Sequence, residues 1–353
     1  MITISLCMIV KNEERLIKRC LECVKDFVDE IIIVDTGSTD RTKEIAGDYT
    51  SRIYDFEWID DFAAARNFCF SKATMDYIYN ADADEVIDKE NIEKFFFLKN
   101  TLNPDVDIVE MQYTNQLEKG STYNFDTENR PKLFKRLRTF RWIDPIHEVI
   151  NCSNNVITSD IKIIHKPEDS HSQRDLSIFI KCTGNGQVLN SRLHMMYARE
   201  LFICGNDEDF YKAFAYFNMS LMSDSLKPED KRLSCCVLAR YYHLKSDVHN
   251  FFKVITKTLN GIVSSELCCE LGSYYMTLED YEEALYWYYL ASSSASADLN
   301  IDYMNFIPNV QMCQCFIKLG NLTEALQHNT LAGFYKPNHP AVLANMQNLN
   351  KLS

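Results

Sequence analysis

Three acidic side chains follow an apolar segment in the stretch YIYNADADEV, residues 77–86. Asp82 and Asp84 form a D-x-D pair, and Glu85 comes directly after it. Two carboxylates spaced in this way at the frayed end of a strand can converge on one hard cation and on the ribose of a nucleotide. A bound Mg²⁺ or Mn²⁺ would neutralise a diphosphate, which an acidic chain does not attract by itself. The pair is therefore a candidate site for a metal-bound nucleotide.

Two other interpretations of the same stretch stay open at this point. DADEV matches the D-x-D-x-V start of a haloacid-dehalogenase-type phosphatase, in which the first Asp is the nucleophile, but that motif normally ends the first strand of its domain. Here three predicted strands come before it. The stretch is also typical of a solvated acidic turn before a helix, with Asp88 as the N-cap and Glu85 merely capping and solvating the turn. Asn80 would then mark a frayed strand end.

Two further segments carry polar groups of use to a nucleotide site. Asp35 ends the predicted strand EIIIVD, before a glycine-containing turn and a helix expected to begin at Ser38 or Thr39. Its carboxylate suits a hydrogen bond to a nucleobase or ribose, or a helix cap. WIDDFAAARN places Arg66 and Asn67 on a predicted helix. Arg66 is expected to pair with a phosphate or to orient Asp35, unless it is simply solvated.

A candidate general base lies in RWIDPIHEVI, residues 141–150. Glu148, beside His147, could take a hydroxyl or thiol proton from an acceptor as a new bond forms. The alternative is a surface glutamate on an edge strand. His165 closes the run IKIIH and would place an imidazole at a strand end, as a further metal ligand or as a structural histidine.

The elements that must position these residues alternate in type over the first third of the chain. Apolar runs and helical runs give the order βαβαβαβ, which predicts a parallel sheet with helices on both faces. Ligands of such sheets bind beyond the carboxyl ends of the strands, where residues 11–13, 35–40 and 82–85 lie. Residues 105–165 are again rich in strand signals, and we expect an antiparallel extension of the sheet on the acceptor side.

After residue 170 the pattern is almost purely helical, so a domain boundary is expected between residues 168 and 185. LGSYYMTLEDYEEALYWYYLA has Gly272, Ala284 and Tyr288 at tetratricopeptide spacing, and MCQCFIKLGNLTEALQHNTLAGFYKP repeats the pattern. A weaker copy includes Tyr197, Ala213 and Phe217. The residues SSSASADLNID lengthen one connection, and a generic helical bundle is the alternative. Either way this segment packs or binds and carries no chemistry.

Composition narrows the classes of function. The 353 residues are 46% hydrophobic and carry a formal net charge of −13, which argues against nucleic acid or an anionic membrane as the main partner. The N-terminal segment resembles a strand and not a signal peptide, and no apolar run reaches the roughly 18 residues of a membrane span. We therefore expect a soluble, cytoplasmic protein whose thirteen cysteines stay reduced, with Cys20 and Cys23 as buried thiols and not half of a zinc site.

Several spaced motifs occur in one order: SLCMIVKNEE, DEIIIVDTGSTDRT, WIDDFAAARN, DADE, RLRTFRWIDPIHE and IIH. This set resembles family 2 glycosyltransferases of the GT-A fold, and in particular the subgroup with a C-terminal tetratricopeptide-type domain that includes sublancin-type peptide S-glycosyltransferases. The resemblance implies an α/β, Rossmann-like nucleotide-sugar domain over residues 1–170, followed by an all-α tetratricopeptide-like array over residues 171–353. After His165 this chain reads KPEDS, where relatives more often have an aromatic residue and a glycine.

The resemblance also implies an inverting transfer from a UDP-sugar with Mg²⁺ or Mn²⁺ as cofactor. The acceptor would be a peptide or protein side chain, Cys or Ser/Thr, with a cell-surface glycan or flagellin as the alternative. A non-catalytic scaffold and a phosphatase are the other classes, and the helical domain could form a homodimer. The implied roles are uridine contact for Asp35, ribose contact for Asp82, metal ligands for Asp84 and His165, base for Glu148, and further donor contacts for Val10, Asn12, Glu13 and Arg66.

Overall fold

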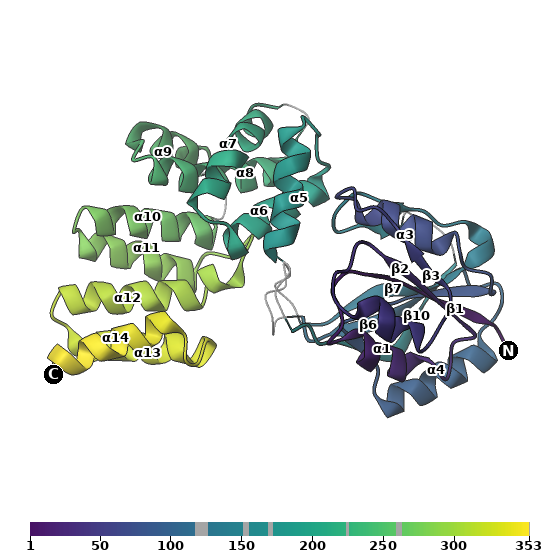
Figure 1. Ribbon diagram of the computed structural model, residues 1–353. Helices are drawn as coiled ribbons and strands as arrows, with labels where there is room; N and C mark the ends of the chain where they lie inside the picture. Colours follow the sequence, from purple (N-terminus) through teal and green to yellow (C-terminus); the bar gives the residue numbers. More distant parts are fainter. Residues whose placement is uncertain (117–125, 151–154, 169–171, 224–225, 259–262, 353) are drawn as a thin grey trace. The chain divides into compact units, whose positions relative to one another are not determined.

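The computed structural model describes residues 1–116, 126–150, 155–168, 172–223, 226–258 and 263–352. The chain divides into two compact units, residues 1–171 and 172–353 (Figure 1). The boundary that we expected between residues 170 and 171 falls outside the described residues. The predicted order of an α/β part followed by an all-α part is confirmed.

The first unit is built on an eight-stranded sheet in the order β3-β2-β1-β4-β7-β6-β10-β5. Strands β1 to β4 are parallel, and β7 joins antiparallel to both β4 and β6, as the predicted extension requires. The expectation is wrong for β10, which runs parallel to β6. The strands are β1 Ile4–Val10, β2 Glu30–Asp35, β3 Ile53–Asp55, β4 Tyr77–Asn80, β5 Glu85–Val86, β6 Ile108–Thr114, β7 Glu128–Lys135 and β10 Val156–His165, and a separate ribbon pairs β8 Trp142–Ile143 with β9 Val149–Ile150.

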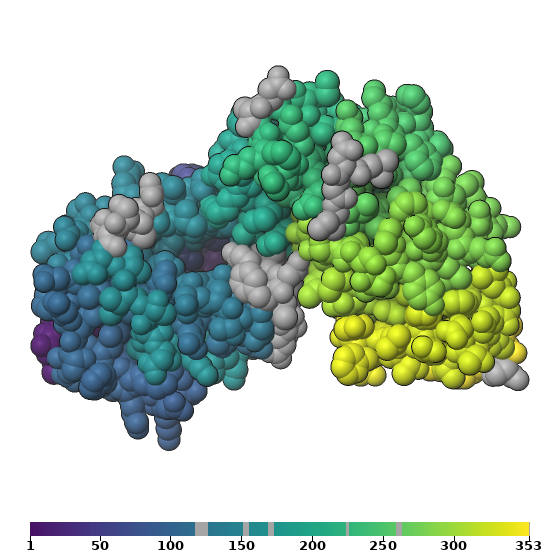
Figure 2. Space-filling view, turned by 180° about the vertical axis from the view of Figure 1, so that it is seen from behind, coloured from purple at the N-terminus to yellow at the C-terminus, as the bar shows by residue number. Residues whose placement is uncertain are grey.

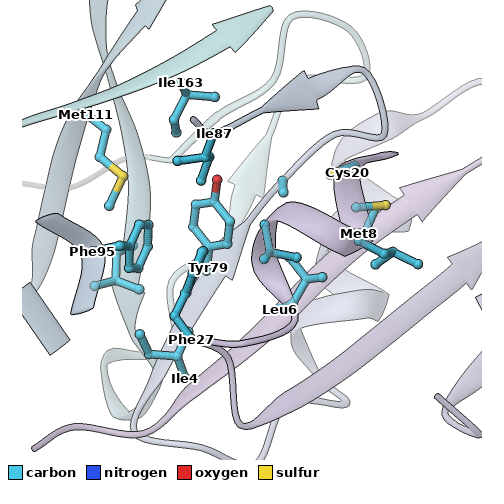
Figure 3. Packing of buried hydrophobic residues seen from close by; sticks show 14 of the residues in the cluster. Ile4, Leu6, Met8, Cys20, Phe27, Tyr79, Ile87, Phe95, Met111 and Ile163 are labelled. Atoms are coloured by element: carbon cyan, nitrogen blue, oxygen red, sulfur yellow. The ribbon is translucent and has the colours of Figure 1, made fainter. Parts of the chain in front are cut away.

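Helices cover both faces of this sheet. Residues of β1 alternate between the faces, so that Leu6 and Met8 pack with α1 and α4, while Cys7 packs with α3. Figure 3 shows the first of these clusters, in which Tyr79 of β4 lies among residues of α1, α4 and the neighbouring strands. The helices of this unit are α1 Ile17–Val24, α2 Thr42–Gly47, α3 Phe62–Phe70, α4 Lys89–Thr101 and the 3-10 turn η1 Arg136–Arg138.

Two predicted helix starts have different outcomes. Asp88 caps α4 as expected, because its side chain accepts a hydrogen bond from the backbone N–H of Asn91. The helix predicted from Ser38 or Thr39 begins only at Thr42. The residues before it form a loop whose hydrogen bonds go to Asp35 and to the residues at and after the end of β1.

The second unit is a stack of helical hairpins, which follow one another from teal to yellow in Figures 1 and 2. In four of the hairpins the second helix begins in the same way: the side chain of an Asn or Asp N-cap accepts a hydrogen bond from the backbone N–H three residues further on. These N-caps are Asn206, Asp247, Asp280 and Asn321. The helices are α5 Ser172–Gly184, α6 Ser191–Cys204, α7 Asp207–Met222, α8 Pro228–Leu244, α9 Val248–Ile255, α10 Ser265–Thr277, α11 Tyr281–Ser293, α12 Phe306–Lys318, α13 Leu322–Tyr335 and α14 Pro340–Leu352, with 3-10 turns η2 Thr256–Thr258 and η3 Ile301–Tyr303.

A small buried residue stands at the same place in the first helix of each of these hairpins: Ala198, Ala239, Gly272 and Cys313. Small side chains at this position let two antiparallel helices approach closely. Within the described residues the repeat therefore has four copies, one more than the sequence pattern revealed. Among the described residues, every helix is too short or too polar to cross a membrane.

Candidate functional site

The acidic loop after β4 lies at the carboxyl edge of the sheet. Its residues lead from β4 to the short strand β5, which pairs with β10 so that Glu85 stands opposite His165. The backbone N–H of Lys166 donates to the carbonyl of Asp84 at 2.8 Å, and the thiol of Cys20 lies 3.4 Å from the carbonyl of Asp82. Contacts from β10 and α1 thus fix the loop that carries the D-x-D pair.

Asp84 and His165 form the part of the site that best suits a cation. Oδ2 of Asp84 lies 3.1 Å from Nε2 of His165. The other carboxylate oxygen, Oδ1, is buried and makes no hydrogen bond within the described structure. A buried unsatisfied acceptor is costly unless something else fills its place. An oxygen-seeking Mg²⁺ or Mn²⁺ would satisfy it, with a diphosphate and water as the remaining ligands.

Arg66 joins the two sides of the site. Its Nη2 donates to Oδ1 of Asp82 at 2.9 Å, its Nη1 donates to Oδ1 of Asn80 at 3.0 Å, and its Nε forms an ion pair with Glu148. Arg66 is only 8% exposed, so the solvated alternative is wrong. Its side chain lies over the end of β4 and contacts Asp82 and Glu148 where we had expected Asp35, while its contact with a phosphate stays a prediction. Asn80, in turn, is a buried partner of Arg66 and not a frayed strand end.

The charges around Asp82 keep it ionised. Burial alone would raise the pKa of Asp82, but attraction to Arg66, and at longer range to Lys132 and Arg130, lowers that pKa below its usual range. The Asp82 side chain remains 35% exposed. A negative, partly open carboxylate at this position can accept hydrogen bonds from hydroxyl groups of a ligand.

Helix α3 also holds the segment that carries Glu148. The side chain of Asn67 makes two hydrogen bonds of 2.9 Å to the backbone of Trp142: Nδ2 donates to the carbonyl, and Oδ1 accepts from the N–H. The N–H of Phe62 donates to the carbonyl of Pro145 at 2.9 Å. Glu148 precedes β9, and its side chain is only 10% exposed, so it is not the surface glutamate of the alternative interpretation. Its carboxylate sits where α3 meets the β8–β9 ribbon.

Asp35 and the residues that follow β1 lie at the same carboxyl edge of the sheet. Oδ2 of Asp35 accepts hydrogen bonds from the N–H groups of Gly37 and Ser38, while the buried Oδ1 makes none within the described structure. Asn12, in the left-handed region at φ 57°, accepts from the N–H of Thr39 at 2.8 Å. The carbonyl of Val10 accepts from Thr36, and the N–H of Glu13 donates to Thr42 at 2.7 Å. Val10, Asn12 and Glu13 therefore fix the loop after β2, which leaves Asp35 as the residue here with a free buried acceptor.

The sequence reasoning missed Lys132 and misjudged Glu85. Glu85 is 2% exposed and forms an ion pair with Lys132, which is itself buried in β7. The interpretation of Glu85 as a solvated capping residue is therefore wrong. Burial, with the nearby charges of Asp82 and Asp84, raises the pKa of Glu85 to about 7 in spite of Lys132. Little in the sequence signalled this pair, because Lys132 is one of several charged residues in the segment ENRPKLFK that forms β7.

Residues 5–155 match the family described as Glycosyl transferase family 2. These residues are a family 2 glycosyltransferase domain. The match contains Asp35, Arg66, Asp82, Asp84 and Glu148, while His165 lies beyond its end.

Two curated relatives each resemble a part of the chain. SunS, an SPbeta prophage-derived glycosyltransferase of Bacillus subtilis, is 28% identical over 59% of this chain and 51% of its own length. A TPR repeat-containing protein of Synechococcus elongatus is 37% identical over 43% of this chain and 36% of its own length. The chain thus spans about a third to a half of the length of these relatives.

Solved structures resemble the chain more distantly. Glucosyl-3-phosphoglycerate synthase of Mycobacterium tuberculosis, in complex with Mn²⁺, UDP-glucose and phosphoglyceric acid, gives a TM-score of 0.39 at 13% identity and covers 54% of this chain and 82% of that one. TarS 1-349 of S. aureus, in complex with UDP-GlcNAc, gives a TM-score of 0.36 at 12% identity and covers 80% and 89%.

Proposed function

We propose that this protein is a metal-dependent, inverting glycosyltransferase that moves a sugar from a UDP-sugar to a side chain of a peptide or protein. The observation that carries the proposal is the set of carboxylates gathered at the edge of the glycosyltransferase domain. Asp84 offers a buried free oxygen, and Arg66 links Asp82 on the donor side to Glu148 on the other. This set combines ligands for a hard cation with a separate carboxylate suited to proton transfer.

The proposed roles follow from the environment of each carboxylate. Asp35 uses one oxygen on its own loop and keeps a buried one for the uridine. Asp82, partly exposed and ionised, would accept from ribose hydroxyls. Asp84 and His165 would hold Mg²⁺ or Mn²⁺, which when bound supplies positive charge to the leaving diphosphate. Glu148 would take the acceptor proton as the acceptor attacks the anomeric carbon.

The peptide acceptor rests on the second unit and on the resemblance to sublancin-type enzymes. Arrays of helical hairpins offer extended surfaces for chain segments, which suits a protein substrate better than a small one. Cys is the favoured nucleophile by resemblance, with Ser or Thr next. The alternative acceptor is a cell-surface glycan or flagellin. We also propose that the helical unit can associate with a second copy of itself, and that the protein acts in the cytoplasm.

The test is a transfer assay with defined products. The protein is incubated with UDP-glucose, UDP-galactose or UDP-N-acetylglucosamine, Mn²⁺ and peptides that contain single Cys or Ser residues, and the peptides are weighed by mass spectrometry. The proposal predicts a mass increase of one sugar and a β-linked product from an α-linked donor by NMR. Retention of the α-configuration would refute inversion, and release of UDP without any glycopeptide would refute the peptide acceptor.

A further inference from the structure

The long connection between α11 and α12 is folded against the helical unit. Every residue from Ala297 to Asn305 is buried or half-buried, and Leu299 is 0% exposed. The short hairpin turn at residues 277–280, by contrast, is exposed throughout. A connection that merely joined two helices would lie in solvent in the same way. Residues 296–303, called the strap below, must therefore gain contacts from the surface that they cross.

That surface is made by the first helices of three successive hairpins, α6, α8 and α10, and is called the inner face below. Helix α8 packs against both α6 and α10. The strap begins on α10, where the N–H of Ser265 donates to the carbonyl of Ser296 at 3.0 Å. It reaches α6, where Nδ2 of Asn300 donates to the carbonyl of Phe202 at 3.2 Å and the ring of Tyr303 meets the ring of Phe202 at 5.2 Å.

The inner face recognises the backbone of the strap through one buried carboxylate. Glu266 of α10 is 0% exposed and accepts hydrogen bonds from three consecutive N–H groups, those of residues 298, 299 and 300, at 3.2, 2.8 and 3.0 Å. A buried carboxylate is costly unless such donors satisfy it. Three backbone donors in a row are supplied by a chain segment and not by a small molecule or a sugar.

Two side chains of the strap are recognised as well. Nη2 of Arg232 in α8 donates to Oδ1 of Asp298 at 2.8 Å, and Leu299 is enclosed completely. The far end is held by an ion pair between Asp302 and Lys336, which directly follows α13. The inner face thus has a cation for an acidic side chain, a carboxylate for the backbone and a pocket for leucine, in the order that an Asp-Leu-Asn segment requires.

We propose that the inner face is a binding site for a peptide segment with an acidic residue followed by leucine, curled as residues 298–300 are, and that the strap occupies this site in cis. A free peptide of this kind then competes with a segment that the chain itself tethers. The tether gives the strap an effective concentration in the millimolar range for a short flexible connection, so the site is closed at rest. The proposal goes beyond the sugar transfer and does not depend on it, because it concerns α6, α8 and α10 alone.

The test uses the full chain and a fluorescein-labelled peptide of residues 295–304, with the sequence ASADLNIDYM. Leu299→Ala weakens the strap but leaves the pocket that the leucine of the peptide enters. Since apparent affinity scales with the fraction of open sites, the variant should bind the peptide at least tenfold more tightly than the wild type by fluorescence anisotropy. Adding Glu266→Gln to the variant should remove that gain. Adding Glu282→Gln instead should leave the gain unchanged, because Glu282 is an exposed residue of α11.

Two results would overturn the proposal that the strap can be displaced. If Leu299→Ala keeps its helical circular dichroism and binds no peptide up to millimolar concentration, the strap is a permanent structural insert and the proposal is wrong. If the variant unfolds, hydrogen exchange of the wild type decides: a displaceable strap requires the amides of residues 298–300 to exchange at least tenfold faster than the core amides of α10. Equal rates would overturn the proposal.

Discussion

Arg66 is the residue on which the geometry of the candidate site depends most. One guanidinium contacts Asn80, Asp82 and Glu148, which come from the end of β4, the acidic loop and the segment before β9. Its planar fork can serve several acceptors at once, and an ammonium group cannot reproduce that arrangement. Arg66 therefore holds the carboxylates of Asp82 and Glu148 close to each other.

Arg66→Lys should lower the kcat of sugar transfer about 100-fold or more, because misplaced charged groups no longer stabilise the transition state. The measurement is UDP release with Mn²⁺ at saturating donor. Arg41→Lys is the matched control, since Arg41 is exposed and pairs with Glu44 on the surface. Equal kcat values for both variants would contradict the role of Arg66.

The buried ion pair between Glu85 and Lys132 leads to a prediction about stability. Both are buried, so removing Lys132 leaves the Glu85 carboxyl buried without its partner, at a cost of up to about 3–5 kcal/mol. Lys132→Met should therefore lower the free energy of unfolding of the first unit strongly, by urea titration. The double change with Glu85→Gln should cost less than Lys132→Met alone. A double variant as unstable as the sum of the two singles would show that the pair does not interact.

The helices of the second unit pack closely against one another, and substitutions at two of its glycines test how much stability depends on this packing. A Cβ on Gly272 would lie 2.7 Å from the ring of the buried Tyr288, whereas a Cβ on Gly333 would meet Val342 at an ordinary 3.5 Å. Gly272→Ala should cost about 1–3 kcal/mol through overpacking. Gly333→Ala should instead stabilise α13 by up to about 1 kcal/mol. Thermal unfolding by circular dichroism compares the two, and a shift of the same sign for both would refute the packing argument.

His194 gives this unit a predicted pH dependence. Its buried ring hydrogen-bonds to Tyr216 and to the carbonyl of Asp230, and burial lowers the pKa of His194. Below its usual pKa of about 6.5 the unfolded chain binds a proton that the folded unit does not. Stability is therefore complete above about pH 6.5 and falls at lower pH, by at most about 1.4 kcal/mol per pH unit.

Urea unfolding of the helical unit at pH 5.5 and 7.5 measures this dependence. His194→Gln should reduce the difference between the two pH values, while the exposed His249→Gln should leave it unchanged. The same pH difference in His194→Gln as in the wild type would contradict the assignment.

The sequence predicted elements better than side-chain contacts. Periodicity and strand-end polarity were enough to predict four parallel strands and a helical second part, because burial imposes those patterns locally. The partners of Arg66 and Glu85 come from β7, the acidic loop and the segment before β9, far apart in the chain. Such pairings depend on the order of strands in the sheet, which no local pattern records. Asn80 was visible only as a polar residue at the end of the apolar strand YIYN, and Lys132 only as one of several charged residues in β7.

At the scale of the whole molecule, the proposed function requires an acidic protein to bind an anionic donor. The formal net charge of −13 opposes a nucleoside diphosphate, and the carboxylates of the candidate site add to that repulsion. A divalent cation held by Asp84 and His165 would remove the conflict at the point where it is strongest. The proposed function therefore requires that donor binding depends on the cation.

Calorimetric titration of UDP-glucose and UDP-N-acetylglucosamine tests this claim most directly. Each donor is titrated into the wild-type chain once in the presence of Mn²⁺ and once in the presence of EDTA. Asp84→Ala and the control Asp160→Ala are measured in the same way, and the side chain of Asp160 is 76% exposed on β10. We expect binding by the wild type and the control only when Mn²⁺ is present, and binding at least tenfold weaker by Asp84→Ala. Equal binding in EDTA, or full affinity in Asp84→Ala, would contradict the account.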